Sequence, residues 1–98
     1  MSYKITAYTR RQAKKLGVTV KPSELKNKKI DVFYKGKKLA SVGDSRYLDF
    51  PTYTKEKGKA FADERRRLYR IRHAKDMKKV PGGIEKQKPG FFAGNLLW

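Results

Sequence analysis

The chain has 98 residues, with 26 lysines and arginines against nine aspartates and glutamates, so its formal net charge is +17 at pH 7. A chain of this length forms one small domain with a modest core. Its charge favours anionic partners, nucleic acid first, an acidic protein surface second and anionic lipid last. It contains no cysteine, which excludes disulfides and thiolate metal sites and fits a reducing cell interior. No apolar run approaches the ~18 residues of a transmembrane segment.

Residues 1–28 are expected to form a basic N-terminal arm, extended apart from one short helix. Thr9 is a suitable N-cap for a helix over residues 10–16, and Gly17 is placed to end it. Few of these residues are large and apolar, so the helix is marginal unless another element packs on it. Residues 18–20 are compatible with a short strand.

Residues 29–80 are expected to form the core of the domain, beginning with a β-hairpin. Two apolar runs flank Lys35-Gly36 in IDVFYKGKKLASV, and a glycine there can take the positive φ of a tight turn. A one-residue shift of register exchanges the two faces of a strand, and two registers remain open. A three-residue loop gives a shared face of Ile30, Val32, Ala40 and Val42, whereas a two-residue loop gives Ile30, Val32, Tyr34 and Leu39.

A long basic helix is predicted over about residues 55–75. At 100° per residue, its apolar side chains form one broad stripe that includes Phe61, Leu68 and Ile71, which predicts packing against the hairpin. Gly58 weakens the first turn by about 1 kcal/mol relative to alanine. The expected fold class is therefore α+β, with a β-hairpin or three-stranded antiparallel sheet packed on one long basic helix.

The segment ERRRLYRIRHAKD within this helix is dense in cations. In projection, part of its arginines lie opposite the apolar stripe, which makes them available to a partner. Unrelieved repulsion at helical spacing suggests an anionic partner. The residues expected to bind nucleic acid or an acidic partner are Arg10, Arg11, Lys14, Lys15, Lys59, Arg66, Arg67 and Arg70.

Arg65 and Arg72 project to the same side as the apolar stripe. We expect their stems to lie along the core and their guanidinium groups to form structural ion pairs with Asp44 and Asp49 in the preceding loop. This division predicts that Arg72→Ala lowers the thermal stability more than Arg70→Ala does.

Residues 81–98 are a linker followed by the apolar tail GFFAGNLLW. The tail either folds back as a wall of the core or docks in a groove of a neighbouring subunit. In the second case its anchors are Phe91, Phe92, Leu96, Leu97 and Trp98.

The sequence favours a non-enzymatic protein without metal or cofactor. The only histidine, His73, lies among arginines without an evident orienting acid. We find no nucleophile–base pair, no metal-ligand cluster and no glycine-rich phosphate loop, and we expect no small-molecule substrate.

Three segments occur in a distinctive order: KKLGVTVKPSELKNKKIDVFYKGKKLASVGD, then YLDFPTY, then ADERRRLYRIRHAKD closing on GFFAGNLLW. Together they resemble a family of small basic proteins encoded by large double-stranded DNA viruses of algae and protists. The resemblance covers residues 14–98 and departs at residues 82–86, where the family is more compact. It implies a virion-associated protein and brings no established active site.

Two functions follow as hypotheses. In the first, the chain is a minor capsid or internal structural protein of a virion, assembled in the host cell interior, that fastens larger viral subunits through its basic arm and apolar tail. In the second, it binds packaged DNA or RNA through phosphate contacts with little sequence preference. Salt dependence separates them, because counterion release weakens phosphate binding steeply.

Overall fold

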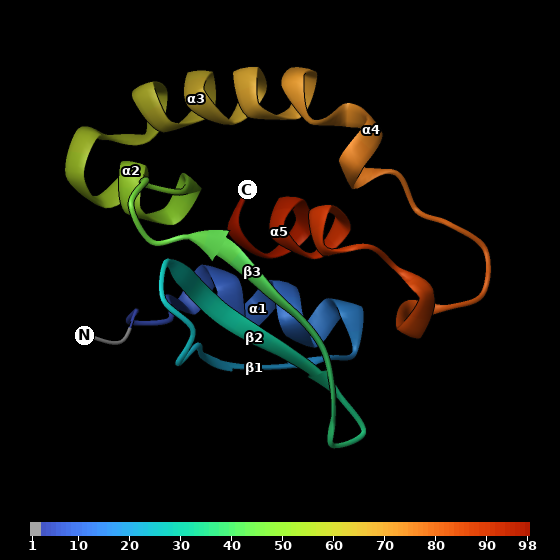
Figure 1. The fold of residues 1–98 in the computed structure, drawn as a ribbon. Helices are drawn as coiled ribbons and strands as arrows, with labels where there is room; N and C mark the ends of the chain where they lie inside the picture. The colour runs from blue at the N-terminus through green and yellow to red at the C-terminus, as the bar shows by residue number, and fades with distance from the viewer. Residues whose placement is uncertain (1–2) are drawn as a thin grey trace.

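A computed structural model describes residues 3–98 and shows an α+β fold, which confirms the expected class (Figure 1). A three-stranded antiparallel sheet has the order β1-β2-β3, with β1 Thr19–Pro22, β2 Lys28–Tyr34 and β3 Lys37–Asp44. The helices are α1 Ala7–Leu16, α2 Phe50–Lys57, α3 Lys59–Arg72, α4 Ala74–Met77, the 3₁₀ helix η1 Ile84–Lys86, and α5 Pro89–Leu97.

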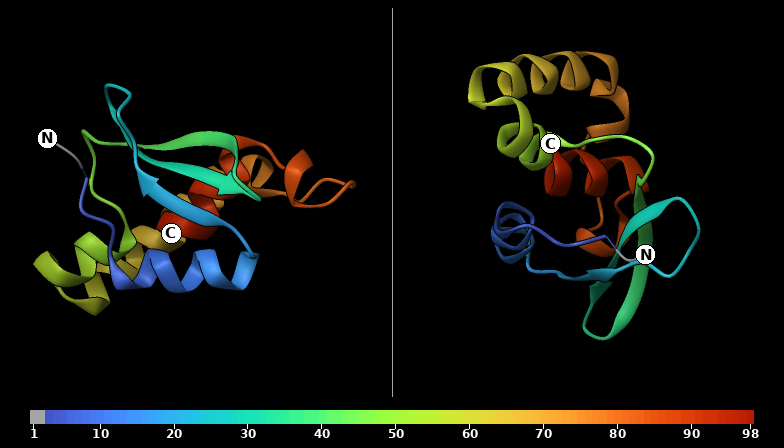
Figure 2. Two further views of the ribbon diagram at one scale, coloured as in Figure 1. Left: turned by 90° about the horizontal axis from the view of Figure 1, so that it is seen from below. Right: turned by 90° about the vertical axis from the view of Figure 1, so that its left-hand side faces the viewer.

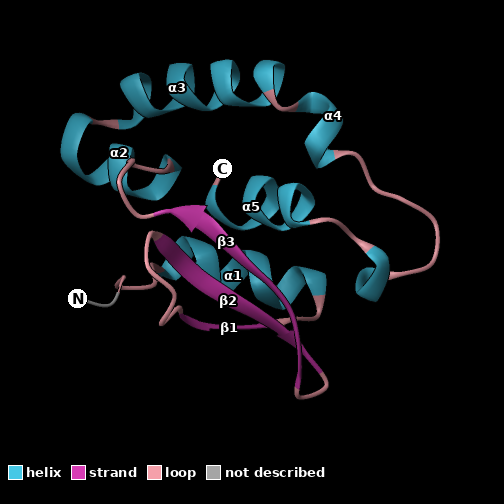
Figure 3. Ribbon diagram, in the orientation of Figure 1, coloured by secondary structure: helices cyan, strands magenta, loops and turns pink. Residues whose placement is uncertain are grey.

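Helix α5 lies at the centre of the molecule. Together with α1 it covers one face of the sheet, and α3 forms a further layer on the other side of α5 (Figures 1 and 2). A long loop that carries η1 leads from α4 back to α5 (Figure 3). The buried core joins β1, β2 and β3 to α1 and α5.

The hairpin combines features of both expected registers. Lys35 and Gly36 have φ values of 49° and 80° and form a two-residue turn between β2 and β3, the positive-φ geometry that suits strand twist. A β-bulge follows, because Val32 pairs with Ala40 and Phe33 with Lys38, which leaves Leu39 as the extra residue. The bulge shifts the register so that Ile30, Val32, Ala40 and Val42 share the buried face.

The expected single helix over residues 55–75 is wrong, since three helices occupy this stretch and its flanks. Asp49 caps α2, which starts before the predicted boundary. Gly58 then separates α2 from α3 with φ 91° and ψ 161°, a backbone region essentially restricted to glycine. The backbone conformation of Gly58 therefore changes the direction of the chain between the two helices. It does more than weaken the first turn of one helix.

The expected packing of the long helix on the sheet is also wrong. Phe61, Leu68 and Ile71 of α3 remain 47%, 40% and 64% exposed, and only Ala62 of that helix is fully buried. Helix α5 takes the position against the sheet instead. It contains no charged residue, so it buries more apolar area at less desolvation cost than α3 with its interspersed arginines.

The segments near both ends of the described chain belong to the core, which corrects the expectation of an extended N-terminal arm and the alternative of a tail docked on a partner. Helix α1 begins at Ala7 with Thr6 as its N-cap rather than Thr9, whose buried hydroxyl donates to the Leu96 carbonyl at 2.9 Å. Strand β1 pairs with β2 along its length. The tail residues Phe91, Phe92, Leu96 and Leu97 are at most 7% exposed, and Trp98 is partly buried against the same core. The tail thus forms the core wall that was the other expectation.

Candidate cationic surface and cleft

One side of helix α1 is buried in the core and the opposite side is exposed to solvent. Thr9 and Ala13 are buried, and the Gln12 side-chain amide donates to the Asn95 carbonyl of α5 at 3.1 Å. The opposite side carries Arg10, Arg11, Lys14 and Lys15, all exposed. We call these four residues the α1 basic face. Packing of α1 on α5 gives the face a rigid support that the sequence alone did not supply.

Most cations of the molecule have no acidic partner. All 26 lysines and arginines lie within residues 3–98, and only Lys29, Lys38, Arg46, Lys59 and Arg67 of them form ion pairs there. The remaining cations include the whole α1 basic face. Like charges at helical spacing repel one another, so this face favours a bound anion.

Arg66 is not an outward-facing cation, contrary to the helical projection. Its guanidinium group donates to the Trp98 carbonyl at 2.5 Å and to the Tyr8 hydroxyl at 2.6 Å, and its carbon Cζ lies 4.0 Å from the centre of the Phe50 ring. Arg70 donates to the same Trp98 carbonyl at 3.2 Å. Arg66 fastens α3 to the rest of the domain, because α1, α2 and the end of α5 lie within reach of its guanidinium group, whereas the Arg70 side chain stays exposed.

The other two cations predicted to face outward from α3 are exposed but engaged locally. Arg67 pairs with Glu64 at 2.6 Å and Lys59 with Asp63 at 3.0 Å. Hydrogen bonds from Arg67 hold the pKa of Glu64 below its usual range. Exposed pairs of this kind hold their partners weakly, so these two cations remain candidates for phosphate contacts.

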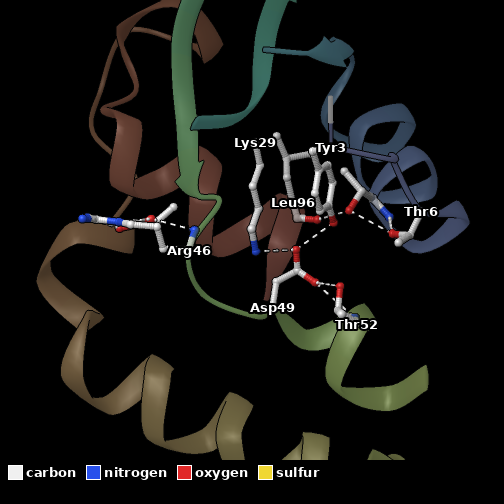
Figure 4. A network of polar contacts seen from close by, with 9 residues as sticks. Tyr3, Thr6, Lys29, Arg46, Asp49, Thr52 and Leu96 are labelled. Atoms are coloured by element: carbon white, nitrogen blue, oxygen red, sulfur yellow. Dashed lines mark hydrogen bonds and ion pairs between the residues drawn. The ribbon is translucent and has the colours of Figure 1, made fainter. Parts of the chain in front are cut away.

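Asp49 is buried and accepts hydrogen bonds from side chains of several different segments (Figure 4). Its Oδ2 accepts from the Lys29 ammonium at 3.0 Å and from the Tyr3 hydroxyl at 2.7 Å. Its Oδ1 accepts from the Thr52 amide at 3.1 Å and the Thr52 hydroxyl at 2.7 Å. Burial raises the pKa of the Tyr3 phenol, and the negative charge of Asp49 raises it further.

The expected ion pairs of Arg65 and Arg72 with Asp44 and Asp49 are therefore wrong. Asp49 is already satisfied by Lys29, and Asp44 forms its ion pair with Arg46 at 2.8 Å. Hydrogen bonds from the Arg46 side chain and backbone lower the pKa of Asp44 to about 2. A neighbour two residues away reaches this carboxylate more easily than an arginine on another helix, since little chain entropy is lost.

Arg65 and Arg72 instead line a cleft between α3 and the open end of the β2–β3 hairpin. The cleft has a volume of about 550 Å³. We call it the α3 cleft. Its walls and floor are formed by Lys28, Lys29, Gly43, Asp44, Tyr47, Leu48, Tyr53, Arg65, Tyr69, Arg72, His73, Ala93, Leu97 and Trp98.

Aromatic rings form one wall of the α3 cleft. Trp98 stacks on Tyr69 with ring centroids 4.4 Å apart and an interplanar angle of 7°. His73 stacks on Tyr69 at 4.3 Å, and its Nδ1 lies 3.2 Å from a carboxylate oxygen of Asp76. Burial raises the pKa of the Tyr69 phenol.

Sequence reasoning missed the α3 cleft because its residues come from widely separated segments. The signal that was present is the mixture of tyrosines with lysines and arginines, typical of surfaces that stack bases. Within residues 3–98 no three histidine, aspartate or glutamate side chains are placed to hold a metal ion. In that same part of the chain, no helix has the length and apolarity to cross a membrane.

Comparisons of this chain with protein-family models, with curated proteins and with solved structures found no match.

Proposed function

We propose that this chain is a non-enzymatic protein that binds nucleic acid through phosphate contacts with little sequence preference. One observation carries the proposal: only five of the 26 lysines and arginines form ion pairs within residues 3–98. A polyanion neutralises such a surface and gains entropy by releasing its own counterions. Phosphate contacts position a protein on nucleic acid without reading bases.

The α1 basic face is the proposed centre of this contact. Arg10, Arg11, Lys14 and Lys15 project from one rigid helix, so binding costs side-chain entropy but little backbone ordering. Lys59 and Arg67 add cations with weak local partners. Arg66 is left out of the contact surface, since the Trp98 carbonyl and the Tyr8 hydroxyl occupy its donors. Arg70 remains a candidate, because its side chain is exposed and gives the Trp98 carbonyl one hydrogen bond at 3.2 Å.

A salt titration with duplex DNA of random sequence tests the proposal. The logarithm of the binding constant should fall linearly with the logarithm of salt concentration, with a slope near −0.9 for each phosphate neutralised. Replacing Arg10, Arg11, Lys14 and Lys15 by glutamine should weaken binding and make the slope shallower, by up to about 0.9 for each phosphate that is no longer neutralised.

The matched control removes the same charge elsewhere. Lys37, Lys75, Lys78 and Lys79 are exposed or partly exposed and form no ion pair within residues 3–98. Glutamine at these four positions should leave the slope closer to that of the parent. Absence of duplex binding at low salt would overturn the proposal. Equal slopes for the two variants would overturn the placement on α1.

A structural role in a viral particle is the second candidate, and the resemblance to viral proteins supports it. Its expected fasteners are engaged within the chain, because β1 pairs in the sheet and α5 forms the core. Nucleic-acid binding therefore ranks first. Quantitative detection of the protein in purified particles tests the structural role, and particles that lack it would eliminate that role.

A further inference from the structure

We infer that the α3 cleft binds a nucleoside phosphate, with the base against its aromatic wall and the phosphate between its cationic side chains. This goes beyond the duplex contact proposed above, since it concerns a concave site and an unpaired base. The two are separable: the cleft residues Lys28, Arg65 and Arg72 lie on β2 and α3, whereas the α1 basic face lies on α1.

The charges of the cleft select an anion. Lys28, Arg65 and Arg72 line it and form no ion pair within residues 3–98. Asp44 is the only acidic side chain among the lining residues, and Arg46 holds it with two hydrogen bonds from its guanidinium group, at 3.0 and 2.8 Å. Lys29 is likewise neutralised by Asp49. The unpaired cations therefore determine the net charge that a ligand meets.

The aromatic wall selects a flat ring system beside that anion. Trp98, Tyr69 and His73 form a stacked column, and Tyr53 lies 6.0 Å from the Trp98 ring. Tyr47, also in the lining, is 68% exposed. Bases stack on such aromatic side chains with little preference for one base, because every base has a π face. Arginine beside such rings supplies planar donors that match phosphate oxygens.

The size and support of the cleft fit a small ligand. Its volume of about 550 Å³ falls within the ~300–1,000 Å³ typical of small-molecule sites. Its floor includes Ala93 and Leu97 of the core helix α5 and Gly43 of β3. A Cβ at Gly43 would lie 2.6 Å from Leu97, so the floor is closely packed.

The only tryptophan of the chain, Trp98, lines the cleft and reports ligand binding directly. Tryptophan emission is followed while adenosine 5′-monophosphate is added, with excitation where adenine does not absorb. We expect a saturable change in emission. Adenosine alone and inorganic phosphate alone should each bind at least about tenfold more weakly, because each forfeits one set of contacts worth about 1.4 kcal/mol or more.

Arg72→Gln and Lys28→Gln test the cationic side of the site. Each should weaken binding of the nucleotide about tenfold, the loss expected for one charge-assisted hydrogen bond. Arg11→Gln on α1 is the matched control and should leave this affinity unchanged. Arg72→Gln should leave the salt dependence of duplex DNA binding unchanged. The nucleotide site and the duplex contact can therefore be disproved separately.

Two sources can supply the same ligand, a free nucleotide or an unpaired nucleotide of a strand. Competition with a single-stranded oligonucleotide distinguishes the two sources. If its dissociation constant is lower than that of the mononucleotide, the ligand is a strand, and if it is higher, the ligand is the free nucleotide. Two results overturn the inference. One is the absence of any saturable change in Trp98 emission and in the amide shifts of Gly43 and Ala93. The other is an acidic peptide with an aromatic side chain that binds as tightly as the nucleotide.

Discussion

At the residue scale, Asp49 is the one acidic residue that is buried within residues 3–98. It caps α2, neutralises the buried Lys29 and accepts from Tyr3 near the start of the chain. All of its hydrogen bonds come from residues that are distant in sequence or lie in the first turn of α2. A buried carboxylate is tolerated only with such complete satisfaction.

Asp49→Ala should strongly destabilise the protein, because it leaves the Lys29 ammonium buried without a counterion. Loss of one partner of a buried pair costs about 3–5 kcal/mol, and loss of the helix cap about 1 kcal/mol more. Urea unfolding followed by circular dichroism measures the difference. Asp44→Ala, on an exposed pair, is the control and should change the unfolding free energy little. Comparable losses for the two variants would contradict the role given to Asp49.

We expect the free energy of unfolding to decline at alkaline pH because of the Tyr3 phenol. Burial, with the charge of Asp49 beside it, raises the pKa of Tyr3 in the folded state, whereas an unfolded tyrosine ionises near pH 10. A group whose folded pKa is raised contributes fully below its unfolded pKa, and this contribution is lost as the pH rises above about 10. Unfolding measured across this range should show it. In Tyr3→Phe the alkaline decline should be smaller, and an unchanged decline would exclude Tyr3 as its source.

At the element scale, a few side chains hold α3 in place, namely the buried Ala62, Tyr69 stacked on Trp98, and Arg66. Gly58 redirects the chain between α2 and α3, and Phe61, Leu68 and Ile71 stay largely exposed. Arg66 reaches down to α1 and the end of α5. The spacing of apolar residues in α3 therefore predicted a helix correctly but predicted the wrong packing face. Spacing alone does not show which other element of the fold lies beside the helix.

Arg66→Ala should lower the stability more than Arg72→Ala does. Arg66 loses two hydrogen bonds and its packing on the Phe50 ring, and hydrogen bonds from a charged group contribute about 1.5–3 kcal/mol each at most. Arg72 forms no ion pair in residues 3–98. Thermal unfolding compares the two, with Arg66→Lys showing whether the planar guanidinium is needed. A larger loss for Arg72→Ala would contradict the fastening role of Arg66.

At the scale of the whole molecule, one short apolar helix organises a strongly charged chain. Helix α5 contacts α1, β3 and α4 and supplies Phe92, Leu96 and Leu97 to the centre of the core. Apart from the buried Lys29, the lysines and arginines of residues 3–98 lie at or near the surface, where water and counterions screen their repulsion. The core is thus built from segments near both ends of the described chain as well as from its middle.

Phe92→Ala should cost about 3–5 kcal/mol, as expected for a fully buried aromatic residue. This is a large part of the stability of a small domain. Phe61→Ala is the matched control, since Phe61 is 47% exposed while Phe92 is 0% exposed, and it should cost much less. Urea unfolding of both variants gives the comparison. The reverse order would support the core expected from the sequence, with α3 packed on the sheet.

The sequence by itself determined the local elements and the character of the surface. The Lys35-Gly36 turn, the end of α1 at Gly17, the α+β class and the excess of cations all follow from local geometry and composition. Only the tertiary structure decided which apolar face packs where, which carboxylate neutralises which cation, and which aromatics meet cations in the α3 cleft. These depend on contacts between residues far apart in the chain, such as Arg66 with Tyr8 and Lys29 with Asp49. Helical projection assigns side chains to a face, but the competition among apolar segments for burial is settled only when the whole chain packs.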